Sequence, residues 1–310
     1  MKKIVKYFSI AAVIFLITVL VVGAFYLKTI YQSFSNNKNL SPAVVAFFER
    51  LNKQEPAPLL KPEDTIRILE GWTSRDIGQY FEENGRWQSE EFLEVAGFPQ
   101  VNYRDNKKLP PIPDFSLNYS FLADKPEYYG LEGYLFPDTY RVYASSTVTE
   151  VIEKMLANFD QKLTPKMRDD IKAQDKTIYD IVTIASIVEK EAPLNYQSGD
   201  NRDARIIAGI FLNRLRIGQA LQSDATLSYI YNDNKSAHSG AELDADSLYN
   251  TYKYKGLPPG PICNPGILAI EAAIYPIKTD YNYFLTTDTG DVVYARTYDE
   301  HLKNKYKYLK

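Results

Sequence analysis

The strongest hydrophobic feature of the chain is one uncharged and mostly apolar run, residues 7–27. About 20 apolar residues are enough to cross the hydrocarbon core of a bilayer as a helix. The run therefore predicts that residues 1–28 form a short tail and a transmembrane anchor. Lysines at positions 2, 3 and 6 precede it, so we expect a cytoplasmic N-terminus and an extracytoplasmic remainder. The alternative is a cleaved signal peptide ending at Val22-Gly23-Ala24, although such peptides usually have apolar regions of only about 7–15 residues.

The pattern after the anchor predicts a tether and then a small α/β module. Residues 29–62 combine prolines and asparagines with little periodicity, which is typical of a tether. The module, residues 63–145, starts with a strand-like alternation around Ile66, followed by a helix capped near Thr73 and a second helix over Ser89–Ala96. This order resembles a LysM-like module, a class that holds N-acetyl sugars. A small packing domain without a ligand would produce the same pattern.

Helical periodicity dominates the remaining part, residues 146–310. A stretch rich in proline and tyrosine, residues 99–130, comes before it and is interpreted as a long loop or linker. A β-hairpin, Tyr281–Thr286 with Asp291–Tyr294, is predicted near the C-terminus. The fold class is therefore α+β, with a mainly helical second part and a terminal hairpin. Helices are expected over Val148–Asp160, from Thr164-Pro165 onward, and over Thr177–Ala192, Ala204–Ile217 and Ile267–Ile274.

Composition then narrows the classes of function. The 310 residues include 36 Lys and Arg and 39 Asp and Glu, a net charge of −3, which argues against a nucleic-acid partner. One cysteine and two histidines argue against a disulfide framework and against a Cys-rich or His-rich metal site. We therefore expect no metal and no cofactor. The 25 tyrosines favour a surface that contacts sugars or other flat polar ligands.

Two carboxylates in one apolar helix are the first candidates for chemistry. On a helical wheel of Asp180–Pro193, both Glu189 and Glu191 fall within the apolar arc. A buried carboxylate needs a partner cation or a raised pKa. Glu191 lies in the last turn before the proline, where the helix dipole favours a neutral acid, as a general acid for glycosidic cleavage requires. The alternative is an internal ion pair, for example with Arg205 or Arg214, and for Glu189 we favour that alternative.

Three further segments gather polar and aromatic side chains. They are Gln222–Thr226, Tyr249–Tyr252 and the stiff loop Gly256–Pro261 with Asn264–Gly266. Flat rings, amides and backbone carbonyls suit a saccharide that carries N-acetyl groups. Each segment alone is more typical of a capped turn.

Together these motifs resemble the endolytic murein transglycosylases of the MltG (YceG-like) type. The resemblance runs from about Ile66 to the C-terminus. The N-terminal anchor also fits this family. The motifs that carry the resemblance, in order, are Leu131–Tyr140 (LEGYLFPDTY), Ala185–Glu191 (ASIVEKE), Phe211–Leu215 (FLNRL), Leu221–Asp224 (LQSD), Tyr249–Tyr252 (YNTY), and Gly256–Pro261 (GLPPGP) with Asn264–Gly266 (NPG).

The resemblance implies an inner-membrane enzyme that cuts nascent peptidoglycan strands internally and leaves 1,6-anhydro-N-acetylmuramic acid ends. Residues 146–310 would be its catalytic domain, and peptidoglycan synthases its expected partners. One glutamate serves first as acid and then as base, and the family motif places it at Glu191. Contacts to the glycan are carried over to Asn213, Gln222, Ser223, Asp224, Thr226, Asn250, Thr251 and Tyr252. Supporting roles fall to Glu189, Arg214 and Tyr134.

Two other functions remain open at this point. One is an anchored glycan-binding scaffold of the wall-synthesis machinery without turnover. The other is a muramidase-type hydrolase in which Asp224 activates water. The products formed from isolated peptidoglycan distinguish all three.

Overall fold

The structure, a computed structural model, describes residues 63–233, 235 and 238–309. The predicted anchor at 7–27 and the tether at 29–62 lie outside the described residues. Within the described part, no helix is both long and apolar enough to cross a membrane.

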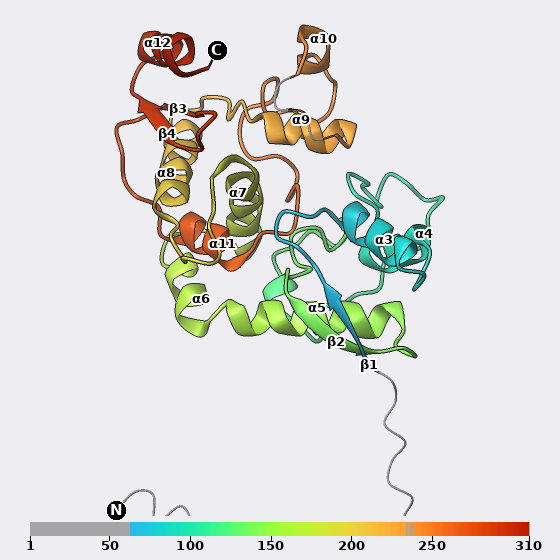
Figure 1. Ribbon diagram of the computed structural model, residues 1–310. Coiled ribbons are helices and arrows are strands. Elements are labelled where there is room, and N and C mark those ends of the chain that lie inside the picture. The colour runs from blue at the N-terminus through green and yellow to red at the C-terminus, as the bar shows by residue number, and fades with distance from the viewer. Residues whose placement is uncertain (1–62, 234, 236–237, 310) are drawn as a thin grey trace, which may run out of the picture. The chain divides into compact units, whose positions relative to one another are not determined.

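The first part of the described chain is built on a pair of strands that enclose two helices in the sequence. Strand β1 (Glu63–Arg67) pairs antiparallel with β2 (Thr139–Tyr143), with Ile66 opposite Tyr140. In the sequence, the segment between the two strands forms α3 (Ser74–Glu83), α4 (Ser89–Ala96) and a short 3₁₀ turn, Ser120–Leu122. The two strands lie side by side (Figure 1). The predicted helix at Ser89–Ala96 has the expected bounds, whereas the sequence analysis did not predict β2.

The second part is mainly helical, as expected, and ends in the predicted hairpin. Strands β3 (Tyr283–Thr286) and β4 (Val292–Ala295) pair antiparallel. A final helix, α12 (Tyr298–Tyr308), follows them and was not predicted. The other helices are α5 (Val148–Lys162), α6 (Pro165–Lys172), α7 (Ile178–Glu191), α8 (Arg202–Arg216), α9 (Asp224–Tyr231), α10 (Gly240–Leu243) and α11 (Ile267–Ile274).

Helix α7 is the central element of this part. It begins with a capping box in which the Thr177 side chain accepts from the Asp180 backbone N–H while the Asp180 carboxylate accepts from the Thr177 N–H. All eight residues of the segment 181–188 are buried, and α7 packs against α8, α9 and α11. A helix surrounded in this way holds the residues at its C-terminal end in a fixed position.

The long segment 99–130 packs onto the core, although it contains little regular structure. Phe115, Phe121 and Leu122 are buried, and the ring of Phe121 lies 4.7 Å from that of Phe159 on α5. One continuous hydrophobic core connects the two parts of the described chain. The expected linker is therefore a packed loop, and the domain boundary at residue 145 stays a prediction.

Candidate active site

Glu191 ends α7 and faces the first turn of α9. The backbone becomes extended at Ala192 (φ −97°, ψ 141°), so the helix ends where Pro193 requires it to end. The hydroxyl of Ser223, the residue before α9, donates a 2.5 Å hydrogen bond to Oε1 of Glu191. The backbone N–H of Ala225 donates to the same carboxylate. The N-terminus of one helix thus meets an acid at the C-terminus of another.

These surroundings shift the pKa of the Glu191 carboxyl in opposite directions. Burial disfavours the charged form and raises the pKa of Glu191 above its usual value, the largest influence on it. The hydrogen bonds from Ser223 and Ala225 lower this pKa, the charge of Asp224 raises it, and that of Arg214 lowers it. Glu191 therefore keeps its proton to a higher pH than an exposed glutamate would, and donors are in place for the carboxylate once the proton leaves.

Arg214 supplies a fixed positive charge near this acid. Its guanidinium donates to the carbonyl oxygens of Leu221 and Asn282, with Nη2 at 2.8 Å from the latter. The same group lies 5.3 Å from the centre of the Tyr283 ring. The side chain is buried, and no ion pair of Arg214 occurs in the described part of the chain. The alternative ion pair between Glu191 and Arg214 is therefore absent, although Arg214 still influences the acid electrostatically.

The two predicted polar segments 222–226 and 249–252 are joined through Thr251. The Thr251 carbonyl accepts from the Gln222 N–H at 3.1 Å, and its hydroxyl accepts from the Ser223 N–H at 3.1 Å. The hydroxyls of Thr251 and Thr226 lie 2.9 Å apart. These contacts fix the start of α9, and with it the hydroxyl that reaches Glu191.

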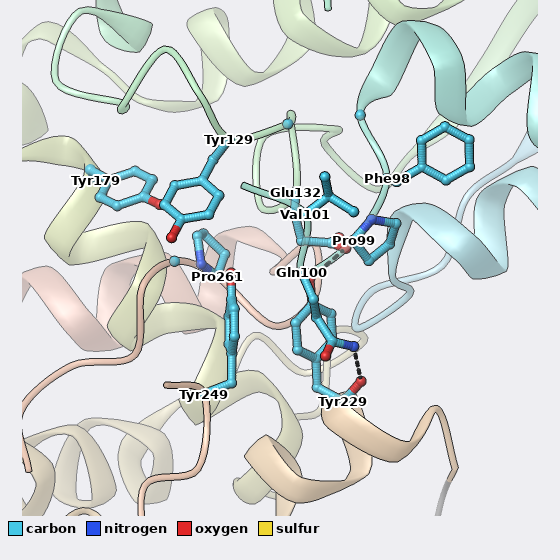
Figure 2. A pocket seen from close by; sticks show the side chains of 13 residues that line it. Phe98, Pro99, Gln100, Val101, Tyr129, Glu132, Tyr179, Tyr229, Tyr249 and Pro261 are labelled. Carbon is cyan, nitrogen blue, oxygen red and sulfur yellow. Dashed lines mark hydrogen bonds between the residues drawn. The ribbon is translucent and has the colours of Figure 1, made fainter. Parts of the chain in front are cut away.

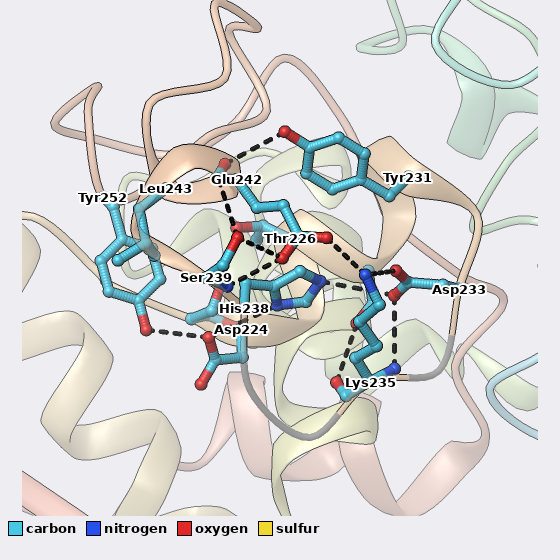
Figure 3. Close-up of polar contacts among 12 residues, drawn as sticks. Asp224, Thr226, Tyr231, Asp233, Lys235, His238, Ser239, Glu242, Leu243 and Tyr252 are labelled. Carbon is cyan, nitrogen blue, oxygen red and sulfur yellow. Dashed lines mark hydrogen bonds and ion pairs between the residues drawn. The ribbon is translucent and has the colours of Figure 1, made fainter.

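A polar cluster beside this junction includes His238, which was not predicted as a site residue. The Tyr252 hydroxyl donates to Oδ1 of Asp224 at 3.1 Å. His238 lies between two acids, with Nδ1 at 3.7 Å from Asp224 and Nε2 at 3.3 Å from Asp233 (Figure 3). One oxygen of Asp224, Oδ1, thus accepts from Tyr252 and faces His238.

The other predicted glycan contacts differ in exposure. Gln222 is exposed, and Asp224 and Tyr252 are partly exposed, so these three are available to a ligand. Ser223, Thr226, Asn250 and Thr251 are buried and form the support behind them. Asn250, for example, donates to the carbonyls of Leu243 and Ala245, both at 2.9 Å.

Two predicted residues lie away from this group. Asn213 donates to the carbonyl of Thr279 at 2.8 Å. Tyr134 is fully buried among aromatic residues, with its ring 5.9 Å from Phe121 and 5.3 Å from Phe159. Both contacts belong to the packing of the fold, and the structure does not bring these side chains to Glu191.

Glu189 is held by hydrogen bonds, and the expected ion pair is absent. Its Oε2 accepts from the Tyr196 hydroxyl at 2.5 Å and from the Gly266 N–H at 3.0 Å. Burial raises the pKa of Glu189 to about 6. Arg205 instead donates a hydrogen bond to the Tyr275 carbonyl. Among the described residues, Glu189 forms no ion pair. Residues two apart on a helix point about 200° apart, so Glu189 and Glu191 serve different surroundings.

A further acid, Glu132, is buried and was not predicted from the sequence. It is only 8 % exposed, and burial raises the pKa of its carboxyl to about 8. The signal was present in the motif LEGYLFPDTY, because the acid stands next to Leu131 in a mostly apolar segment. Without a helical period there, the sequence did not reveal which way Glu132 points.

Comparisons with known proteins agree on the family. The sequence model of the YceG-like family matches residues 22–307. Curated proteins named endolytic murein transglycosylase are similar to this chain. The protein of Bacillus subtilis (strain 168) is 39 % identical over 179 residues, covering 58 % of this chain and 48 % of its own length. That of Streptococcus pneumoniae serotype 2 (strain D39) is 39 % identical over 310 residues, covering 89 % and 52 %.

A solved structure is similar as well. The crystal structure of a YceG-like protein of Listeria monocytogenes has a TM-score of 0.64 and 31 % sequence identity, with 88 % of each chain covered. The chain spans about half the length of the curated relatives it matches. On the family model and these similarities, this chain belongs to the YceG-like family.

Proposed function

We propose that the protein is a membrane-anchored endolytic lytic transglycosylase. In this proposal it cleaves the MurNAc–GlcNAc bond of nascent peptidoglycan strands and leaves 1,6-anhydro-MurNAc ends. The names of the curated relatives support the activity class. The single observation that carries the mechanism is the partly buried Glu191 carboxyl, with its raised pKa, at the N-terminus of α9.

Glu191 acts twice in the proposed reaction. As an acid it gives its proton to the glycosidic oxygen while the bond from that oxygen to the muramyl C1 breaks. As a carboxylate it then takes the proton from the muramyl C6 hydroxyl, whose oxygen bonds to C1 and closes the anhydro ring. No water is consumed, and Glu191 regains its proton at the end.

The surroundings of Glu191 suit both steps. Burial favours the protonated acid before the first step, and a general acid works best when its pKa is close to the working pH. After proton transfer, the Ser223 hydroxyl and the Ala225 N–H stabilise the carboxylate that has formed. The nearby charge of Arg214 acts in the same direction.

The neighbouring acids are less suited to a hydrolytic role. Asp224 is bonded to Tyr252 and stands beside His238. Glu189 is bonded to Tyr196 and Gly266. A single acid at the reacting bond favours the internal C6 hydroxyl as the nucleophile over an activated water, because a glycoside hydrolase normally uses two carboxylates.

The remaining parts of the proposal concern location and partners. Residues 7–27 would anchor the protein in the cytoplasmic membrane, with the N-terminus inside and the catalytic domain outside. The β1–β2 pair, which encloses α3 and α4 in the sequence, supports a LysM-like module in residues 63–145. Peptidoglycan synthases that extend the same strands would be partners.

Product analysis tests this function. The full-length protein in detergent is incubated with isolated peptidoglycan, and the released fragments are analysed by mass spectrometry. Internal cleavage with anhydro-muramyl ends is expected. Reducing ends would instead establish a hydrolase, and bound glycan without any released fragment would establish a scaffold.

A further inference from the structure

Glu132 joins three segments that lie far apart in the sequence. Its Oε1 accepts from the Ser74 N–H at 2.9 Å and from Nδ2 of Asn264 at 3.1 Å. Its Oε2 accepts from the Tyr229 hydroxyl at 3.4 Å. Within the described residues no cation forms an ion pair with it. A buried carboxyl group depends on such hydrogen bonds, so all three segments are held at one point.

One oxygen of Glu132 is fixed against a rigid surface. Ser74 is the first residue of α3, so its N–H is one of the amides at the helix N-terminus that have no partner within the helix. Asn264 is itself held at its Oδ1 by the N–H groups of Gly133 and Leu135, at 2.9 and 3.0 Å. Its Nδ2 also donates to the Trp72 carbonyl at 3.0 Å. Glu132 therefore extends from a surface that does not move easily.

The other oxygen reaches α9, the helix whose N-terminal end contacts the proposed acid Glu191. Tyr229 lies in the last turns of α9, and its hydroxyl meets Glu132 (Figure 2). The side-chain amide of Gln100 donates a 2.7 Å hydrogen bond to the backbone carbonyl of Tyr229. Gln100 has a φ of 64°, a conformation uncommon for residues other than glycine. A strained backbone of this kind persists only where the surrounding structure enforces it. Here it lies at Gln100, whose side chain contacts α9.

Helix α9 is thus held near both ends. Its N-terminal end contacts Glu191 through Ser223 and Ala225. Its C-terminal half contacts Glu132 and Gln100 through Tyr229, about 9 Å along the axis at 1.5 Å per residue. A short helix moves as one rigid piece, so a change near its C-terminal end alters how its first turn meets Glu191.

We propose that Glu132 is a positioning residue for the transglycosylase reaction, which sets the orientation of α9 and thereby the hydrogen bonds that α9 makes to Glu191. It touches no reacting atom. Its role in the reaction rests on the proposed function, whereas its hydrogen bond to Tyr229 on α9 does not.

The test compares three variants of the full-length protein in detergent. Glu132→Leu removes the acceptors and leaves an apolar side chain of similar size. Tyr229→Phe removes only the hydroxyl on the α9 side and keeps the ring. Phe92→Leu is the matched control, because Phe92 is fully buried and packs on Phe81 in the α3–α4 layer.

The first readout is hydrogen–deuterium exchange of the backbone amides, which needs no turnover. In Glu132→Leu and Tyr229→Phe, the amides of α9 should exchange about tenfold faster, the factor that corresponds to about 1.4 kcal/mol. Those of α5 and α8 should keep their wild-type rates. In Phe92→Leu, α9 should exchange as in the wild type. Unchanged α9 exchange, or an equal increase in all helices, overturns the proposal.

The second readout is the pH profile of kcat. When α9 turns away, Glu191 loses donors that lower its pKa, so the alkaline limb should move to higher pH, and kcat should fall while KM stays constant. Glu132→Gln keeps an acceptor for Ser74 and Asn264 and should retain the wild-type profile. Should Glu132→Leu fail to fold, Tyr229→Phe decides both readouts. A wild-type protein without turnover would refute the proposed function, and the exchange data would still test the hold on α9.

Discussion

The hydroxyl of Ser223 donates a 2.5 Å hydrogen bond to Oε1 of Glu191. Ser223 stands before the first turn of α9, and Glu191 is the last residue of α7. A donor that favours the carboxylate is thereby combined with a partly buried site that favours the neutral acid. This combination is what an acid needs if it is to release and regain a proton in one reaction cycle.

Removing that donor should impair turnover and change its pH dependence. In Ser223→Ala the pKa of Glu191 should rise further, because an influence that lowers it is lost. We expect kcat at neutral pH to fall about tenfold, as for the loss of a hydrogen bond to a charged group. The alkaline limb of the profile should move to higher pH. Ser198→Ala, an exposed loop serine, is the control, and an alkaline limb unchanged in Ser223→Ala would contradict the assignment.

Thr251 should matter for stability as well as for activity. Thr251→Val keeps the shape but leaves the Ser223 N–H and the Thr226 hydroxyl without this partner. The loss of buried partners costs about 1–3 kcal/mol. Chemical unfolding of the variant should show a decrease in stability of that size, with reduced turnover. An equally stable variant would mean that the 222–226 and 249–252 segments are not held together by this side chain.

Glu189 should make folding less favourable at higher pH. Its pKa is about 6 in the folded protein against an ordinary 4.5, so the native state binds more protons than the unfolded state over this interval. The free energy of unfolding therefore falls as pH rises from 4.5 through 6. In Glu189→Gln this contribution is absent, so the variant should gain up to about 2 kcal/mol relative to the wild type across the interval. Thermal unfolding at several pH values measures the difference, and a constant difference would refute this prediction.

Asn264 offers a test of the junction around Glu132. In Asn264→Asp, an oxygen replaces the Nδ2 that lies 3.1 Å from Oε1 of Glu132. Two carboxylates at this distance share a proton, so the cost should increase with pH. We expect a loss of about 2–4 kcal/mol at about pH 8 and a smaller loss at about pH 5. Unfolding curves at the two pH values measure it, and the opposite order would mean that the two side chains are not in contact.

The parts of the fold that were predicted correctly are those specified by neighbours in the sequence. Helix α7 has its own cap at Thr177, its own apolar face and its own stop at Pro193. Because of that stop, the position of Glu191 at a helix end could be derived before the structure was known. Helices α4 and α11 were likewise predicted with the observed bounds.

The parts that were missed depend on contacts between distant residues. Strand β2 exists because it pairs with β1, more than seventy positions earlier, and Glu132 finds its donors at Ser74, Tyr229 and Asn264. The start of α9 depends on Thr251. The hydrophobic periodicity of the local sequence does not indicate such pairings. The expected ion pair of Glu189 was wrong for the same reason, since the partner turned out to be Tyr196.

The most direct test of the central claim compares Glu191→Gln with Glu189→Gln in the release of anhydro-muramyl fragments from peptidoglycan. Loss of a general acid costs about 10²–10⁴-fold in rate. Glu191→Gln should therefore release almost no product while it still folds and binds glycan strands, and Glu189→Gln should retain most of the wild-type rate. An active Glu191→Gln beside an inactive Glu189→Gln would contradict the account.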